Sequence, residues 1–472
     1  MASVVQVEVA ILGGGPAGYV AAIRAAQLGA VVVLIEEREI GGTCLNRGCI
    51  PTKALLKSSE IANLVKRARE FGVDARQEAV NWEASGSRKD RIIKSLRMGL
   101  EQLLAKNKVQ VIRGAGVVKD PNHILVNTGD MEVDVHCHKL IITTGSEPTL
   151  PDISGLGLEN VITSDEALEL QKVPENIIII GAGAIGLEFA TMFNFAGAKV
   201  TVVEYQERIL MWEDEELTTE LLKSLRRQGI TFKLAARVKE TRKAGEDLEL
   251  VVEEKGVESS IKTEAVLVAV GRKLRAFSPG ITSLGLMIEK GAIAVNEKME
   301  TSVPGVYAAG DVVGSKLLAH LAFAEGRVAA ENALGYNSSL NYNAVPSCVY
   351  TSPEVASVGL NEKACRERGL KVKVGRFDFR TNGRALCLGE REGFVKVVVD
   401  AGKHTILGAQ ILGAQASEMI SELTLAVSLG ARAESLAELV HPHPSLSEAI
   451  MEACGDAIGR AIHKAPDQSM GK

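Results

Sequence analysis

Residues 7–36, "VEVAILGGGPAGYVAAIRAAQLGAVVVLIE", combine an apolar run, a glycine-rich turn, a helical pattern and a second apolar run that ends in an acid. Gly13, Gly15 and Gly18 have the spacing GxGxxG, which allows a tight turn, close approach of a pyrophosphate and close packing of the following helix. The start of that helix attracts phosphate, and Glu36 is placed to accept hydrogen bonds from ribose hydroxyls. The stretch therefore predicts a dinucleotide-binding unit.

The same pattern occurs a second time. The strand-like run "NIIII" leads into "GAGAIG", a helical segment and "KVTVVE", which ends at Glu204. The separation is 168 residues both between Gly13 and Gly181 and between Glu36 and Glu204. The chain is therefore expected to contain two related dinucleotide-binding units, the second with the glycines Gly181, Gly183 and Gly186.

An insertion in the first unit carries two cysteines. The units close with the similar strands "KLIITTG", ending at Gly145, and "AVLVAVG", ending at Gly271, but the separation here is only 126 residues. The first unit is thus longer by 42 residues, and "GGTCLNRGCIPTKALL" (41–56) lies in that extra length. This places Cys44 and Cys49 beside the first dinucleotide site. Residues five apart in an ideal helix lie beyond disulfide reach, so the helix must be distorted or begin between them, with Gly48 as a plausible relief point.

The composition narrows the function classes. A net charge of −5 and an aromatic content of 4% argue against nucleic acid as the main partner. The uncharged run 177–187 is shorter than the about 20 apolar residues of a membrane span. The N-terminus runs directly into a strand without a targeting segment, and 7 cysteines in 472 residues make no disulfide framework. We therefore expect a cytoplasmic protein without a membrane partner, in which any disulfide is catalytic.

The chain divides into four expected segments. The two dinucleotide-binding units occupy 1–150 and 151–272, a central segment covers 273–345, and a separate α+β domain covers 346–472. The central segment contains "TSVPGVYAAGD", in which Asp311 follows a buried strand-like run. This acid could hold a ribityl chain; the alternative is a turn residue that caps the following helix.

Six motifs together carry a family resemblance: "GGGPAGY", "GGTCLNRGCIPTKAL", "GAGAIGLE", "VYAAGD", "AHLAFAEG" and "HPHPSLSE". The chain resembles the flavin-dependent pyridine nucleotide–disulfide oxidoreductases over essentially its whole length. The resemblance implies an α/β fold with two Rossmann-like domains, the first binding FAD and the second NAD. It also implies that the C-terminal α+β domain forms the interface of a homodimer.

The resemblance also implies roles for single residues. Cys44 and Cys49 would form a redox-active disulfide, with Cys44 exchanging with substrate and Cys49 facing the flavin, and Lys53 would lie near the flavin ring. His443 would act as the base, oriented by Glu448, since a carboxylate partner raises the pKa of an imidazole and fixes its tautomer. Beyond the two glycine fingerprints and their acids, the implied cofactor-binding residues are Gly145, Gly271, Asp311, Ala319 and His320.

The implied reaction is oxidation of protein-bound dihydrolipoamide, with electrons passing through the Cys44–Cys49 pair and FAD to NAD. The partner would be a lipoyl-bearing protein of a 2-oxo acid dehydrogenase or glycine cleavage complex. Glu204 predicts NAD rather than NADP, because its carboxylate would repel a 2′-phosphate. Arg47, between the cysteines, could favour an anionic substrate. Two alternatives stay open: NADH-dependent reduction of another disulfide, such as glutathione, and a structural or docking subunit with incidental diaphorase activity.

The run "HCHK" contains His136, Cys137 and His138 and resembles a metal site. Successive residues of a strand point to opposite faces, which leaves only two of these ligands on one side. We therefore expect no metal site there.

Overall fold

The computed structural model describes residues 3–76 and 79–465. Its first sheet has the strand order β3-β2-β1-β6-β5-β4, and β19 pairs with β6. Strands β1, β2, β3, β6 and β19 are parallel, whereas β4 and β5 form an antiparallel hairpin beside β6. The strands are β1 (Ser3–Leu12), β2 (Val32–Glu36), β3 (Gln110–Arg113), β4 (Ala115–Asp120), β5 (His123–Asn127), β6 (Glu132–Ile142) and β19 (Val306–Ala308).

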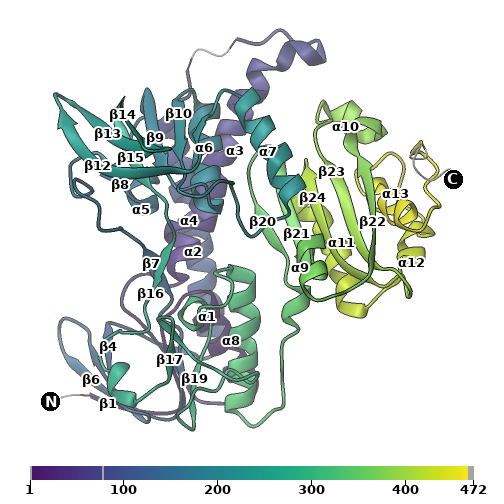
Figure 1. The fold of residues 1–472 in the computed structure, drawn as a ribbon. Coiled ribbons are helices and arrows are strands. Elements are labelled where there is room, and N and C mark those ends of the chain that lie inside the picture. The colour runs from purple at the N-terminus through teal and green to yellow at the C-terminus, as the bar shows by residue number, and fades with distance from the viewer. Residues whose placement is uncertain (1–2, 77–78, 466–472) are drawn as a thin grey trace.

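Strand β1 is buried on both faces, as a central parallel strand requires. Val9 and Ile11 pack against the helices α1 (Pro16–Gln27) and α8 (Ala319–Ala333), while Ala10 and Leu12 belong to a second apolar cluster on the other face. Because β19 and α8 come from beyond the second unit, the chain returns to the first sheet after leaving it (Figure 1). The short pairs β7 (Ser146–Pro148) with β16 (Arg272–Leu274), and β17 (Ile288–Glu289) with β18 (Ala292–Ile293), lie in the connecting segments.

The second unit repeats the plan with a parallel sheet in the order β11-β10-β9-β15-β8. An antiparallel sheet, β12-β13-β14, stands beside it. The strands are β8 (Val161–Ile162), β9 (Asn176–Ile180), β10 (Lys199–Val203), β11 (Thr231–Lys233), β12 (Ala236–Ala244), β13 (Asp247–Glu254), β14 (Val257–Thr263) and β15 (Ala265–Val268). The helices are α5 (Ser164–Ala167), α6 (Ala184–Ala196) and α7 (Glu215–Arg227).

The cysteine-bearing insertion folds into helices α2 (Gly42–Arg47), α3 (Cys49–Lys66) and α4 (Trp82–Lys106). In Figure 1 these helices run between the two nucleotide-binding units. Leu55 and Leu56 of α3 share one apolar core with Phe189 and Phe193 of α6. The insertion is therefore fixed against the second unit, although it starts from the first.

The C-terminal domain is an antiparallel sheet in the order β20-β21-β24-β23-β22, with helices α11 and α13 packed on it (Figure 1). The predicted α/β fold, with two Rossmann-like units and a C-terminal α+β domain, is confirmed. The elements of this domain are β20 (Ser347–Val349), β21 (Glu354–Gly359), β22 (Val372–Asp378), β23 (Phe394–Asp400), β24 (Ile406–Gly413), α9 (Glu362–Glu367), α10 (Gly383–Leu388), α11 (Ala416–Leu429), α12 (Ala433–Ala437) and α13 (Glu448–Ala457). Within residues 3–76 and 79–465, none of the helices is both long and apolar enough for a bilayer crossing.

Candidate active site

The two cysteines of the insertion lie in different helices. Helix α2 ends at Arg47, and α3 begins at Cys49. Gly48 between them has φ −144° and ψ −112°, outside the helical range. Of the two expected alternatives, a distorted helix or a helix that begins between the cysteines, the structure shows the second. Cys44 and Cys49 are free thiols in this structure and lie within hydrogen-bonding reach of each other.

The two thiols differ strongly in acidity. The hydrogen bond from Cys44 and the charge of Lys53 lower the pKa of Cys49 to about 7, against the opposing effect of burial. The same hydrogen bond, together with burial, raises the pKa of Cys44. Lys53 and the contact with Cys44 therefore favour the thiolate at Cys49, toward which the S–H group of Cys44 donates a hydrogen bond. A stable thiolate at one member of a dithiol is what disulfide exchange requires of a leaving group.

Lys53 is held beside the cysteines by residues from two other parts of the chain. Its Nζ lies 2.8 Å from Oε2 of Glu188 and 4.4 Å from the centroid of the Tyr350 ring. Glu188 belongs to α6, and its Oε1 accepts a hydrogen bond from the backbone N–H of Tyr350 (3.1 Å). The ammonium group is therefore fixed next to Cys49, one helical turn away. Sequence reasoning missed Glu188 and Tyr350, although Glu188 stands in the quoted "GAGAIGLE".

The acids of the two units make the same local contacts. One carboxylate oxygen of Glu36 accepts from Gly14 N–H (2.5 Å) and the other from Arg38 N–H (2.8 Å). Glu204 repeats this pattern 168 residues later, with backbone partners Ala182 (2.6 Å) and Gln206 (2.8 Å). Each acid thus lies at the carboxyl end of its strand against the glycine turn, where a ribose is expected.

The glycine turns leave room for a group that the chain itself does not supply. The third glycine packs on the first: a Cβ on Gly18 would lie 1.8 Å from Gly13 O, and the corresponding distance at Gly186 is 2.0 Å. Around the second glycines there is space, since the nearest atom to such a Cβ would be 3.9 Å away at Gly15 and 3.6 Å at Gly183. Helices α1 and α6 start there without a side-chain cap, so free N–H groups face this space. Both turns therefore fit a pyrophosphate.

The other predicted cofactor residues lie near the first unit's turn or at the junction of the units. Oδ2 of Asp311 accepts from the hydroxyl of Ser146 (2.5 Å), which in turn accepts from Nε of Arg272 (2.7 Å). Asp311 is the first residue of the short helical turn Asp311–Val313, whose N-cap position is occupied by Gly310. Gly145 and Gly271 precede β7 and β16 with positive φ. Ala319 and His320 begin α8, and the His320 ring contacts Pro346 O (2.7 Å).

Arg47 is neutralised within the chain. Its Nη1 lies 2.5 Å from Oε2 of Glu39, and its Nε lies 3.7 Å from Oδ2 of Asp165. Both carboxylates compete with any anionic group of a substrate for this guanidinium. The expectation that Arg47 favours an anionic substrate therefore gains no support from the structure.

His443 and Glu448 form a pair at the start of α13. Nδ1 of His443 lies 2.8 Å from Oε1 of Glu448, whose other oxygen accepts from Ser445 N–H (2.7 Å). The His443 side chain is 80% exposed, and none of the described residues hydrogen-bonds its Nε2 atom. His441, by contrast, is only 5% exposed at its side chain and contacts Glu422 (3.0 Å). Of the two histidines, His443 is thus the one whose free ring nitrogen reaches solvent.

The comparisons with known proteins cover nearly the whole chain. Residues 7–326 match the family pyridine nucleotide-disulphide oxidoreductase, and residues 345–454 match its dimerisation domain. The chain is 40% identical over 472 residues to dihydrolipoyl dehydrogenase of Bacillus subtilis (97% of this chain, 99% of the relative). It is 43% identical over 461 residues to dihydrolipoyl dehydrogenase of Thermus scotoductus (97% and 98%).

Solved structures agree with these relatives in fold. LpdA from Mycobacterium tuberculosis superimposes with a TM-score of 0.88 at 26% identity, covering 95% of this chain and 99% of that one. The flavoprotein disulfide reductase RclA from Escherichia coli, as its Cu(II) complex, gives a TM-score of 0.86 at 27% identity with the same coverage. With matches across its nucleotide-binding units and its C-terminal domain, the chain belongs to the pyridine nucleotide-disulphide oxidoreductase family.

Proposed function

We propose that the protein is a dihydrolipoyl dehydrogenase, which oxidises protein-bound dihydrolipoamide and passes the electrons to NAD. The observation that carries this proposal is the pair of free thiols Cys44 and Cys49 on either side of the helix break at Gly48, with the ammonium group of Lys53 fixed one helical turn from Cys49 by Glu188. The full-length similarity to curated dihydrolipoyl dehydrogenases supports the choice of substrate. FAD fits the first glycine turn and NAD the second.

Thiol exchange at the cysteines accounts for the substrate reaction. In the oxidised enzyme, one thiolate of dihydrolipoamide attacks Sγ of Cys44, breaks the bond to Cys49 and releases the Cys49 thiolate. The second substrate thiolate then attacks the substrate sulfur of this mixed disulfide and releases Cys44. Lipoamide leaves with one new S–S bond, and the electron pair remains on the two cysteines. When bound, FAD supplies electron-pair exchange with this dithiol and hydride exchange with the nicotinamide.

His443 and Lys53 handle the accompanying charge. Nε2 of His443 accepts the proton of an incoming thiol, and Glu448 fixes the imidazole through Nδ1 and stabilises its charged form. The Lys53 ammonium stabilises the Cys49 thiolate, because it is fixed by Glu188 at 2.8 Å. These two residues act on opposite members of the exchange, one on the substrate thiol and one on the leaving thiolate.

A turnover assay separates this function from the two alternatives. The protein with about one FAD per chain should reduce NAD with dihydrolipoamide, and should oxidise NADH with oxidised glutathione at least about a hundredfold more slowly. Efficient reduction of glutathione would favour the first alternative. Dye reduction without dihydrolipoamide turnover would favour a docking subunit.

Exchange of Glu204 for arginine should change the nucleotide preference. Glu204→Arg removes the acceptor for the ribose 2′-hydroxyl and adds a charge that attracts a 2′-phosphate. We expect the ratio of kcat/KM for NAD to that for NADP to fall at least about tenfold, or roughly 1.4 kcal/mol. Arg208→Ala is the control, because this guanidinium is bound to Thr218 (3.1 Å) and Met211 O (3.3 Å) within the chain. A wild-type preference for NADP would contradict the assignment.

The partner and the location belong to the same proposal. Dihydrolipoamide on a mobile protein domain must come from a lipoyl-bearing component of a 2-oxo acid dehydrogenase or glycine cleavage complex. The match of residues 345–454 to the dimerisation domain supports a homodimer. A cytoplasmic location completes the proposal.

A further inference from the structure

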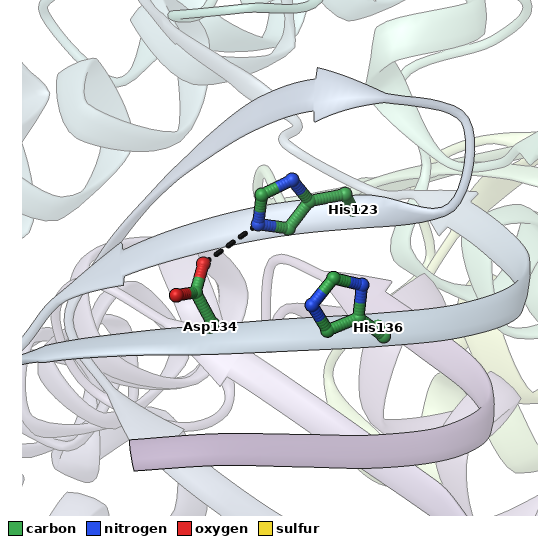
Figure 2. A group of neighbouring side chains, drawn as sticks. All are labelled: His123, Asp134 and His136. Carbon is green, nitrogen blue, oxygen red and sulfur yellow. Dashed lines mark hydrogen bonds and ion pairs between the residues drawn. The ribbon is translucent and has the colours of Figure 1, made fainter. Parts of the chain in front are cut away.

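Three possible metal ligands meet on one face of the antiparallel strands β5 and β6 of the first sheet. They are His123 of β5 with Asp134 and His136 of β6, and their ligand atoms all lie within 4.8 Å of one another. Figure 2 shows the two histidine rings side by side with the carboxylate between the strands. Nε2 of His123 lies 2.7 Å from Oδ1 of Asp134. The cluster lies at the β4–β6 end of the first sheet, away from helix α2 with its cysteine (Figure 1).

The strand register brings these side chains together. His123 is directly paired with His136 across the antiparallel ladder, and Asp134 precedes His136 by two residues on the same face. The residues of the opposite face, among them Ile124, Val135 and Cys137, are buried. This burial fixes the face that the three ligands occupy, because a shift of one residue would expose the apolar set.

The run 136–138 alone predicts no metal site, and the structure agrees that Cys137 points away from His136. The ligands that complete the group come instead from the adjacent strand and from the preceding residue on the same face. His138, two residues further along β6, does not join the group. The sequence analysis considered only the run 136–138, because only the pairing of β5 with β6 brings His123 and Asp134 next to His136.

We propose that His123, Asp134 and His136 bind a divalent late first-row transition-metal ion, such as Zn²⁺ or Cu²⁺, at a site separate from the dithiol. Two imidazoles and one carboxylate are ligands that such ions accept, and water completes the coordination. Metal–nitrogen distances of about 2.0–2.1 Å place neighbouring ligand atoms about 3.4 Å apart. Nε2 of His123 and Oδ1 of Asp134, now 2.7 Å apart, must therefore separate slightly to bind one ion together.

A small rearrangement of side chains achieves this. The ring centroids are 4.6 Å apart with planes 9° apart, and Nε2 of His123 is hydrogen-bonded to Asp134, so at least one side chain must turn before the three ligands can share one ion. One ring must turn about its Cβ–Cγ bond, a torsion with a broad energy minimum. The backbone need not move, since the ladder already sets the spacing of the strands.

The test measures Zn²⁺ binding to the oxidised FAD-loaded protein, without a histidine tag, by isothermal titration calorimetry. The Cys44→Ser/Cys49→Ser background removes the thiols as competing ligands. We expect one ion per chain with a Kd of about 10 µM or tighter, and a loss of affinity of at least about tenfold in either His123→Ala or His136→Ala. His138→Ala is the matched control, because it removes a histidine from the same strand face outside the cluster, and its affinity should stay unchanged.

Cu²⁺ provides a second readout. Electron paramagnetic resonance of the Cu²⁺-loaded protein should show nitrogen couplings from two imidazoles, and His123→Ala should remove one of them. Flavin absorbance and dihydrolipoamide turnover should be the same in all the histidine variants with intact cysteines, which shows that they fold. Absence of Zn²⁺ binding in the parent protein, or affinity that survives in either His123→Ala or His136→Ala, would overturn the proposal and leave only the hydrogen bond between His123 and Asp134.

Discussion

Cys49→Ser and His443→Ala homodimers should each be almost inactive with dihydrolipoamide, whereas the two variants unfolded and refolded together should recover about a quarter of wild-type activity. Random pairing makes about half of the dimers mixed. If each active site combines the dithiol of one chain with His443 of the other, a mixed dimer has one site with both defects and one intact site. Half of the dimers then have half of their sites intact, which gives a quarter of the wild-type activity.

Several features of the single chain support a shared site. His443 presents a free Nε2 to solvent although its other nitrogen is fixed by Glu448. Figure 1 places α13, whose first residue is Glu448, on the far side of the C-terminal domain from α2. Large apolar side chains are exposed in the same domain, including Leu429 at 73% and Val440 at 93%. Burial of such residues against a second copy is a common source of dimer stability.

A control mixture tests whether unfolding and refolding two variants together can by itself restore activity with dihydrolipoamide. Cys49→Ser refolded with Cys44→Ser gives mixed dimers in which every site lacks one cysteine, so activity should stay near zero. If the mixture of Cys49→Ser and His443→Ala also stays near zero while mixed dimers are present, His443 serves the dithiol of its own chain or no dithiol at all.

The features of this site that could be predicted from the sequence are those determined by residues close together along the chain. A glycine fingerprint followed by an acid constrains about thirty consecutive residues, so the two turns, their 168-residue repeat and the helices α1 and α6 could be predicted. The break at Gly48 was also predictable, because the separation of Cys44 and Cys49 conflicts with a continuous helix.

Contacts between distant segments could not be predicted in the same way. Lys53 is visible in the sequence, but its partner Glu188 is 135 residues away and meets it only because α3 packs on α6. The charge of Arg47 suggested an anionic substrate, whereas folding places Glu39 and Asp165 around it. Such side-chain partners depend on which faces of the helices and strands pack against each other. A short sequence motif does not specify this packing.

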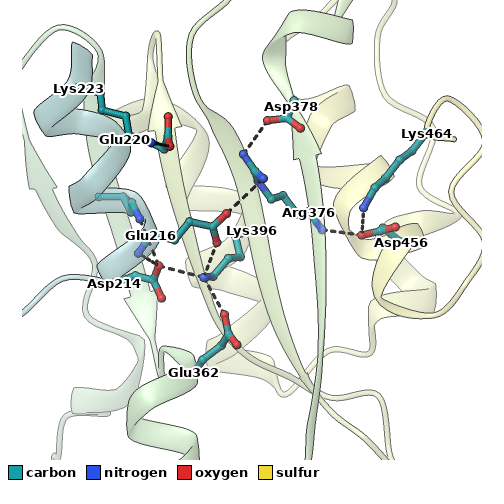
Figure 3. A network of polar contacts seen from close by, with 11 residues as sticks. Asp214, Glu216, Glu220, Lys223, Glu362, Arg376, Asp378, Lys396, Asp456 and Lys464 are labelled. Atoms are coloured by element: carbon teal, nitrogen blue, oxygen red, sulfur yellow. Dashed lines mark hydrogen bonds and ion pairs between the residues drawn. The ribbon is translucent and has the colours of Figure 1, made fainter. Parts of the chain in front are cut away.

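Replacement of Lys396 should cause a large loss of stability. Its side chain is 3% exposed on β23, and its Nζ lies within 3.0 Å of three carboxylates. Figure 3 shows the three acids around Lys396. Asp214 and Glu216 lie at the start of α7 in the second nucleotide-binding unit, and Glu362 lies in α9. Burial opposes the charge, but hydrogen bonds to Glu362 and Asp214 raise the pKa of Lys396 to about 12. The ammonium group thus stays charged and joins the C-terminal domain to the second unit.

Lys396→Ala should lower the free energy of unfolding by about 3–5 kcal/mol, because it leaves the carboxylate of buried Asp214 without its cation. The urea midpoint of the FAD-loaded protein at fixed concentration measures this change. Lys396→Met keeps most of the aliphatic volume but not the charge, so it should lose nearly as much stability as Lys396→Ala.

Lys223→Ala is the control for the loss of a lysine as such, since its ion pair with Glu220 in α7 is exposed and is worth at most about 1 kcal/mol. Both lysines and their carboxylate partners are drawn in Figure 3: Lys396 is buried and has three partners, whereas Lys223 is exposed and has one. The carboxylate of Asp214 also accepts from the N–H groups of Glu216 and Leu217 at the start of α7, and these donors offset only part of the cost of losing its cation. Loss of Lys396 therefore leaves a buried charge at a helix start that orients the contact with β23. Wild-type stability in Lys396→Met would show that packing of the aliphatic chain, not the charge, holds the two domains together at this point.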